Sequence, residues 1–129
     1  MQPLGEAPPV SFILTPDRAR AKPFYAGALG LPIISEDDFA VTFGLAGGAV
    51  VRLTDLPGHE AAGHTVLGFR VEDIRSSVAG LVSRGITFRV YDGMGQDRDG
   101  IWETPDGSAK VAWFTDPDGN ILSLTEFAA

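Results

Sequence analysis

The chain has 129 residues, a formal net charge of −7 and no cysteine. This length suits one ordinary domain with its own core, and the lack of cysteine excludes disulfides, thiolate metal ligands and cysteine nucleophiles. The acidic charge argues against nucleic acid, whose phosphates need a basic surface, and no apolar run reaches the roughly 18 residues of a membrane span. We therefore expect a cytoplasmic protein with neither nucleic acid nor a membrane as partner.

The first half of the chain predicts one helix among four strands. Residues 1–9 are expected to form a flexible tail without a secretion-signal pattern, and residues 10–15 are a β-prone run. Asp17 can cap a helix that ends at Gly30. Because an interior proline costs about 3 kcal/mol, Pro23 predicts an irregular opening turn, with the regular helix starting close to Pro23. Further strands are expected near residues 33–36, 39–45 and 49–54.

The second half repeats this order. A strand is expected over residues 66–71, and Asp73 begins a helix that Gly85 ends. The helical period places four apolar residues on one face, namely Ile74, Val78, Leu81 and Val82. The remaining strands are expected over residues 86–91, 109–115 and 120–127.

The two halves match at two different offsets. The helix-capping aspartates lie 56 residues apart, whereas Gly48 and Gly119 in the last hairpins lie 71 residues apart. The second copy therefore contains 15 additional residues, which fall between its second and third strands, in the segment 92–108. This segment is either a plain surface insertion or a loop that contacts a ligand. Ile101 and Trp102 favour the second interpretation, because apolar residues in a polar loop usually dock on something.

Each half thus consists of a strand, a helix and three strands. The residues that carry a known pattern are Phe24-Tyr25, Leu29-Gly30-Leu31, Val71-Glu72-Asp73, and the Phe114 to Gly119 turn before Leu122-Ser123-Leu124. In this order and spacing the chain resembles the vicinal oxygen chelate superfamily, which includes glyoxalases, extradiol dioxygenases and bleomycin-resistance proteins. The resemblance covers residues 10–127. It implies an α+β fold in which two βαβββ modules, residues 10–56 and 64–127, form a curved mixed sheet around a central cleft, and it implies a homodimer.

Strand alternation assigns residues to the two faces of the expected sheet. One face packs on the helices; it holds Val41, Phe43, Val51 and Leu53, with Ala112, Phe114, Leu122 and Leu124 as their counterparts. The opposite face is mostly apolar with a few polar groups, the usual composition of a small-molecule site. The candidate ligand-binding residues are Phe12, Thr42, Arg52, Thr54, His64, Arg70, Trp102, Trp113 and Ser123.

Three of these residues suggest what the ligand is. Arg52 and Arg70 are suited to orient a carboxylate or phosphate by paired hydrogen bonds, although an internal salt bridge explains Arg52 equally well. Trp113 is either a stacking platform or a core residue. Two arginines in the pocket favour a neutral or anionic aromatic molecule over a strongly cationic one.

Metal-using members of the superfamily place a His, Glu or Gln ligand at each of four strand positions. The resemblance puts these positions at Val10, Arg52, Val66 and Ser123. Valine has no lone pair, arginine is a permanent cation, and one serine hydroxyl is a poor ligand. We therefore expect neither a metal ion nor another cofactor.

The sequence leaves three functional hypotheses. The first is a metal-free protein that binds a small aromatic or amphipathic molecule in its cleft. The second is a lyase- or dioxygenase-type enzyme with a shifted metal site, formed by His59, Glu60 and His64, or with Glu103 or Asp99 of the long loop as general base. The third is a structural or regulatory subunit whose cleft is filled by its own Trp102 loop. The identity of the ligand stays open.

Overall fold

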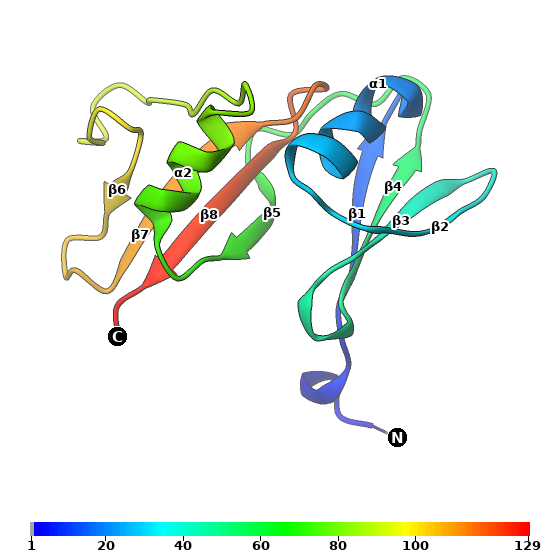
Figure 1. Cartoon of the computed structure of the whole chain (residues 1–129), viewed down its shortest axis with the longest axis horizontal. Helices are drawn as coiled ribbons and strands as arrows, with labels where there is room; N and C mark the ends of the chain where they lie inside the picture. Colours follow the sequence, from blue (N-terminus) through cyan, green and yellow to red (C-terminus); the bar gives the residue numbers. More distant parts are fainter. Residues whose placement is uncertain (1) are drawn as a thin grey trace. The chain divides into compact units, whose positions relative to one another are not determined.

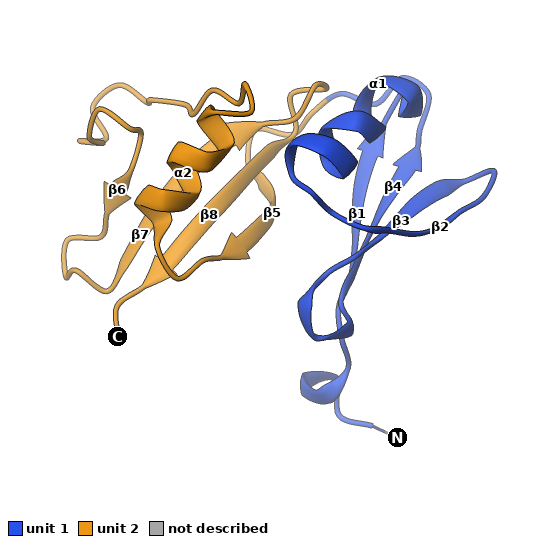
Figure 2. Ribbon diagram, viewed as in Figure 1, with its two compact units in different colours: residues 1–60 blue, residues 61–129 orange. Residues whose placement is uncertain are grey.

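The computed structural model describes residues 2–129, which divide into two compact units, unit 1 up to residue 60 and unit 2 from residue 61 to 129 (Figure 2). Each unit contains one four-stranded mixed sheet. The strand order is β1-β4-β3-β2 in unit 1 and β5-β8-β7-β6 in unit 2. In both sheets the first two strands named are parallel and the other neighbours are antiparallel. The α+β class and the βαβββ repeat are thus confirmed.

Unit 1 is built on the strands β1 (Val10–Thr15), β2 (Ile33–Glu36), β3 (Ala40–Gly44) and β4 (Val50–Asp55) (Figure 1). Its helical segments are η1 (Leu4–Glu6), α1 (Arg18–Pro23), η2 (Phe24–Ala28) and η3 (Ala46–Gly48). The predicted core face is buried: Val41, Phe43, Val51 and Leu53 are inaccessible to solvent. No helix in the described residues is long and apolar enough to cross a membrane.

Unit 2 contains β5 (Thr65–Arg70), α2 (Ile74–Val82), β6 (Trp102–Glu103), β7 (Ala109–Thr115) and β8 (Ile121–Phe127). Ala112, Phe114, Leu122 and Leu124 are buried on the side of the sheet that carries α2. Asp73 caps α2 by accepting a hydrogen bond from the Ser76 N–H at 3.1 Å. Val82 is exposed rather than on the apolar face, because it is the last residue of the helix and the buried contacts end with Val78 and the half-buried Leu81.

The first helix differs from its expected form. Asp17 caps it, with its carboxylate accepting from the Arg20 N–H at 3.3 Å. The regular turns of α1 then precede Pro23, and a π-helical segment follows, in which the Leu29 N–H donates to the Phe24 carbonyl at 3.0 Å. The predicted regular helix starting at Pro23 is therefore wrong. Proline has no N–H to donate to the preceding turn, so the α-helical hydrogen bonds are interrupted at Pro23. The segment after it has the wider hydrogen-bond pattern of a π-helix.

The predicted strand over residues 86–91 does not form. Phe88 makes only an isolated bridge to Phe114, and the Arg89 N–H donates to the Trp113 carbonyl at 2.8 Å. Further along the same edge of β7, Trp102 of β6 pairs with Val111. The inserted residues therefore interrupt an edge strand. The side chain of Gln96, and not a neighbouring strand, satisfies the backbone groups that follow Arg89.

Candidate functional site

In unit 1 the structure brings together four of the candidate residues on one face of the sheet. Phe12 and Thr42 are the register neighbours of Arg52 on β1 and β3. Thr54 lies two residues beyond Arg52 on the same face, and its hydroxyl donates to the Arg52 carbonyl at 3.1 Å. The Phe12 side chain is 59% exposed, so this face has no cover within unit 1.

Arg52 is ion-paired. Its guanidinium lies 3.8 Å from the Asp37 carboxylate, which also accepts the N–H groups of Phe39 at 2.7 Å and Ala40 at 3.0 Å. These two backbone hydrogen bonds, and then Arg52, lower the pKa of Asp37. Of the two interpretations of Arg52, the structure therefore supports the salt bridge.

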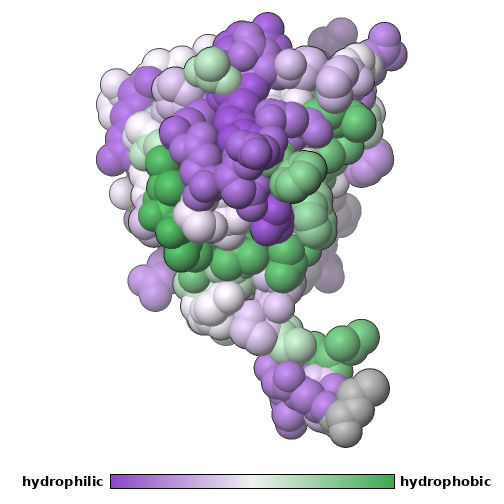
Figure 3. Space-filling view, turned by 90° about the vertical axis from the view of Figure 1, so that its right-hand side faces the viewer, coloured by the Kyte–Doolittle hydropathy of each residue, from purple (hydrophilic) through white to green (hydrophobic). Residues whose placement is uncertain are grey.

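A second polar cluster fixes the β2–β3 hairpin of unit 1. The Arg18 guanidinium lies 2.7 Å from Asp55 and 3.4 Å from Glu36, and Lys22 reaches Glu36 at 2.5 Å. The hydrogen bond to Asp55 raises the pKa of Arg18, and the hydrogen bond from Lys22 lowers the pKa of Glu36. Figure 3 shows hydrophilic side chains gathered on this side of the molecule, with hydrophobic ones beside them. We assign this cluster to holding the hairpin in place.

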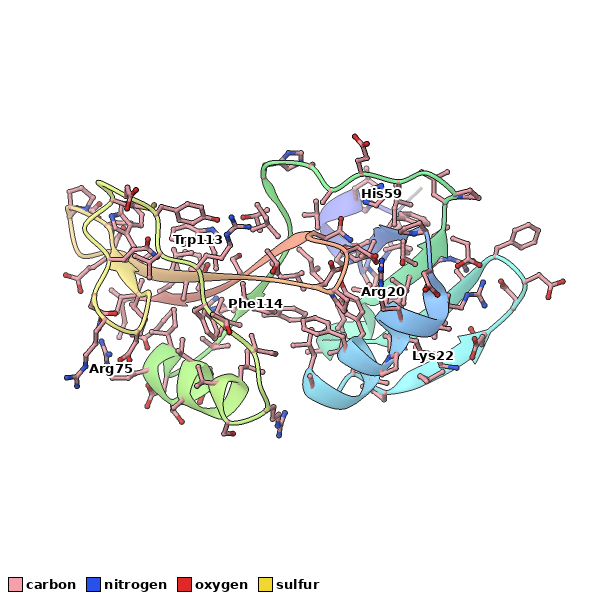
Figure 4. The ribbon with its side chains drawn as sticks, turned by 90° about the horizontal axis from the view of Figure 1, so that it is seen from above. Arg20, Lys22, His59, Arg75, Trp113 and Phe114 are labelled. Atoms are coloured by element: carbon pink, nitrogen blue, oxygen red, sulfur yellow. The ribbon has the colours of Figure 1, made fainter. Side chains whose placement is uncertain are left out.

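Unit 2 contains a pocket of about 510 Å³. It lies on the face of the sheet opposite α2: Figure 4 shows Trp113 on one side of the ribbon, and Phe114 with α2 on the other. The residues that line it are Ala61, Ala62, Gly63, His64, Thr65, Arg89, Tyr91, Met94, Trp113, Gly119 and Ile121. Its walls are thus mainly apolar and aromatic, as in most small-molecule sites.

An aromatic cluster forms one side of this pocket. The ring of Tyr91 meets Trp113 edge-on, with centroids 5.9 Å apart and planes at 80°. Trp102 also packs against Trp113, with ring centroids 6.4 Å apart and planes tilted by 38°. The Arg89 guanidinium carbon sits 5.5 Å from the Tyr91 ring centroid, within cation–π range. Trp113 therefore contacts two other rings and stays half-buried.

Hydrogen bonds from Gln96 hold the segment that carries Arg89 and Tyr91. The Gln96 side-chain carbonyl accepts the Tyr91 N–H at 2.6 Å. Its amide nitrogen donates to the Arg89 carbonyl at 2.9 Å and to the Gly100 carbonyl at 2.7 Å. Gly100 has φ +82°, and a Cβ there would lie 3.3 Å from the Arg89 carbonyl, so glycine allows this close approach. One neutral side chain thus ties both ends of the loop together.

The same loop is anchored to α2 by charge. Arg75 donates to Asp97 at 2.9 Å and to Asp99 at 2.5 Å, and Asp97 also accepts the Ile101 N–H at 3.0 Å. Burial would raise the pKa of Asp97, but the hydrogen bonds from Arg75 and the backbone outweigh it and leave the pKa lowered. Asp99, a candidate general base, therefore faces Arg75, which Figure 4 shows on the side of the sheet that carries α2. Ile101 is buried, as expected of an apolar residue that docks.

The other candidates of unit 2 have different positions. His64 and Trp113 line the pocket, and Trp102 packs against Trp113. Ser123 is the register neighbour of Trp113, but it is only 7% exposed. Arg70 lies two residues further along β5 than Gly68, the neighbour of Ser123, and its guanidinium carbon is 5.3 Å from the Phe127 ring centroid. Arg70 is not among the residues that line the pocket.

Sequence reasoning missed Arg89, Tyr91 and Met94. The alternation that assigned Trp113 to the ligand face was not applied to residues 86–91. Arg89 and Tyr91 are two residues apart, so in an extended segment their side chains point to the same face. The Phe88–Phe114 bridge sets Arg89 opposite Trp113. The pattern was therefore sufficient to find both residues. Met94 lies in the inserted segment, where no periodicity applies.

The side chains present do not fit a metal centre. Val10 and Val66 offer no ligand atom, Arg52 is ion-paired, and Ser123 is a single hydroxyl. Within residues 2–129, no group of three or more His, Cys, Asp or Glu side chains is placed to hold a metal ion.

The fold and its pocket define a class of small two-module α+β proteins. A family model for the Glyoxalase/Bleomycin resistance protein/Dioxygenase superfamily matches residues 9–124, and the chain belongs to this superfamily. No curated protein matches the chain.

Three solved structures illustrate the relationship. A superfamily member from Sphaerobacter thermophilus is 26% identical with a TM-score of 0.70, covering 92% of this chain and 95% of the other. A glyoxalase/bleomycin resistance protein/dioxygenase from Nocardioides is 20% identical with a TM-score of 0.67, covering 92% and 81%. TnmS3, an antibiotic binding protein from a Streptomyces species, is 24% identical with a TM-score of 0.65, covering 92% and 95%.

Proposed function

We propose that this protein binds a small aromatic or amphipathic molecule, without a metal ion, in the pocket of unit 2. The observation that carries the proposal is the half-buried Trp113 ring, which lies at a cavity of about 510 Å³. The volume lies in the range of pockets that enclose drug-sized molecules, about 300–1,000 Å³. The similar fold of TnmS3, which is named for antibiotic binding, agrees with this function.

The geometry gives each wall a role. The ligand ring packs on the indole of Trp113, and Tyr91 and Trp102 fix the orientation of that indole by the ring contacts described above. Ile121, Met94 and residues 61–65 line the rest of the pocket and contact the edges of the ligand. Ring contacts contribute about 0.5–1.5 kcal/mol each beyond apolar burial, so removing Trp113 is expected to weaken binding by at least tenfold.

The test uses a neutral fluorescent aromatic, N-phenylnaphthylamine, whose emission rises when it leaves water. Titration of the full chain is compared with Trp113→Leu and with Phe39→Leu, a matched control because Phe39 is 73% exposed and lies in unit 1. We expect Trp113→Leu to bind the probe at least tenfold more weakly and Phe39→Leu to bind it like the wild type. Addition of a chelator is expected to leave binding by the wild type unchanged. Equal binding by Trp113→Leu, or binding abolished by chelator, contradicts the proposal.

We further propose that the chain forms a homodimer in the cytoplasm. The support is the uncovered apolar face of the unit 1 sheet, where Val10 is 52%, Phe12 59% and Ile34 60% exposed. Contiguous apolar surface of this kind usually marks an interaction site. Sedimentation equilibrium is expected to give twice the chain mass, and to give the single-chain mass for Phe12→Asp. A wild type that sediments as a single chain contradicts this proposal.

A further inference from the structure

The arginines of this chain differ in whether a carboxylate neutralises them. Arg18, Arg52 and Arg75 each lie within 4 Å of an Asp or Glu side chain, at 2.7, 3.8 and 2.5 Å respectively. Arg89 has no such partner among the described residues, and its guanidinium meets only the Tyr91 ring. Because Arg89 is exposed, its five N–H donors are accessible to a bound molecule.

The charge of the pocket wall contrasts with that of the whole chain. The sequence carries 17 Asp and Glu residues and a net charge of −7. None of these carboxylates lines the pocket, whereas Arg89 and His64 both do. A cation without a counter-ion attracts an anion more strongly than one that a neighbouring carboxylate already neutralises. The pocket therefore selects against cations and favours a negative charge beside Arg89.

Arg89 and Trp113 are placed to act on one molecule. The Arg89 N–H donates to the Trp113 carbonyl at 2.8 Å, so the two backbones are adjacent. Phe88 and Phe114 pair on the core side, which puts the side chains of Arg89 and Trp113 together on the opposite face. A substituent at the edge of a planar ligand that stacks on Trp113 therefore lies within reach of the Arg89 guanidinium.

We infer that the ligand is an anionic aromatic molecule, with its ring on Trp113 and its carboxylate, sulfonate or phosphate hydrogen-bonded to Arg89. This inference rests on the proposed function and adds the chemical class of its ligand. Arginine matches such planar oxygen pairs with two parallel N–H donors. Binding of an anionic aromatic is expected to be at least tenfold tighter than binding of its neutral analogue, which corresponds to about 1.4 kcal/mol.

The test compares two probes with one scaffold, anilinonaphthalene sulfonate and the neutral N-phenylnaphthylamine, by fluorescence titration. Arg89→Gln removes the cation, and Arg84→Gln is the control, because it makes the same charge change at an exposed residue that does not line the pocket. We expect Arg89→Gln to weaken binding of the sulfonate at least tenfold more than it weakens binding of the neutral probe. Arg84→Gln is expected to change neither affinity.

The outcomes separate the two proposals. If Trp113→Leu weakens both probes but the ratio of their affinities is the same in the wild type and in Arg89→Gln, the ligand class is wrong and the aromatic site stands. If neither probe responds to Trp113→Leu, the proposed function itself fails. If Arg84→Gln weakens the sulfonate as much as Arg89→Gln does, net charge and not Arg89 selects the anion, and the inference is overturned.

Discussion

The substitution Gln96→Ala tests whether a neutral side chain holds the pocket wall. It removes three hydrogen bonds, from the Tyr91 N–H at 2.6 Å and to the carbonyls of Arg89 at 2.9 Å and Gly100 at 2.7 Å. Each is worth about 1 kcal/mol net, and the bond to Arg89, which is exposed, contributes less. Alanine loses no side-chain entropy on folding, whereas the ordered Gln96 side chain does, and this difference offsets up to about 1 kcal/mol of the loss. We therefore expect the free energy of unfolding of unit 2 to fall by about 2 kcal/mol.

Urea denaturation followed by tryptophan fluorescence measures this loss. Both tryptophans, Trp102 and Trp113, belong to unit 2, so the signal reports this unit alone. Gln2→Ala is the matched control, because Gln2 makes one exposed hydrogen bond in unit 1. Arg75→Ala cuts the exposed ion pairs of the same loop and is expected to lower the free energy of unfolding by less than Gln96→Ala does, because solvent screens exposed pairs.

The reasoning is refuted if Gln96→Ala unfolds within about 0.5 kcal/mol of the wild type, the range of an ordinary surface substitution. Gln96→Glu gives an independent check, because it sets a carboxylate oxygen against the carbonyls of Arg89 and Gly100. That repulsion raises the pKa of the introduced carboxyl. The variant is therefore least stable above that pKa and recovers as the pH falls through it, when the protonated group donates again.

Two further predictions concern β5 and the β6–β7 turn. A Cβ at Gly68 would lie 2.8 Å from the Ser123 hydroxyl, so Gly68→Ala is expected to lower the free energy of unfolding by about 1–3 kcal/mol. In a Ser123→Ala background the same substitution is expected to cost much less. Urea denaturation measures both losses, and equal losses in the two backgrounds contradict the clash. Hydrogen bonds from Ser108 and Thr104 lower the pKa of Asp106 to about 2. Its stabilisation is therefore present above the ordinary value of 3.8 and lost as the pH falls toward about 2; NMR titration of the carboxyl checks this, and a midpoint near 3.8 refutes it.

Most of the fold could be predicted because its signals are local. The aspartate caps at Asp17 and Asp73 mark both helix starts, and strict alternation puts residues such as Phe43 and Leu122 in the core. The repeat then supplies the strand order twice. The helix around Pro23 failed because the missing N–H predicts a break without saying which side of it stays regular.

The site was harder to predict because partners distant in sequence decide it. Arg52 and Arg89 look alike in the sequence, but only Arg52 acquires a carboxylate, from the hairpin residue Asp37. The strand over residues 86–91 was wrong because Gln96, from the inserted loop, takes the hydrogen bonds that a strand would use. Neither fact can be derived from periodicity, which describes one segment at a time.

The interrupted edge of β7 has a consequence for how binding specificity can change. The inserted loop leaves β7 beside Trp113 and returns to it beside Val111, so its two ends are fixed a short distance apart while the chain between them forms part of the pocket wall. Closing a longer loop is inexpensive, at about 0.6 kcal/mol for each doubling of length. New sequences can therefore be inserted between Tyr91 and Gln96, where Met94 lines the pocket, without altering the sheet that holds Trp113. This makes the loop the natural segment to randomise when a protein of this fold is selected for a new ligand.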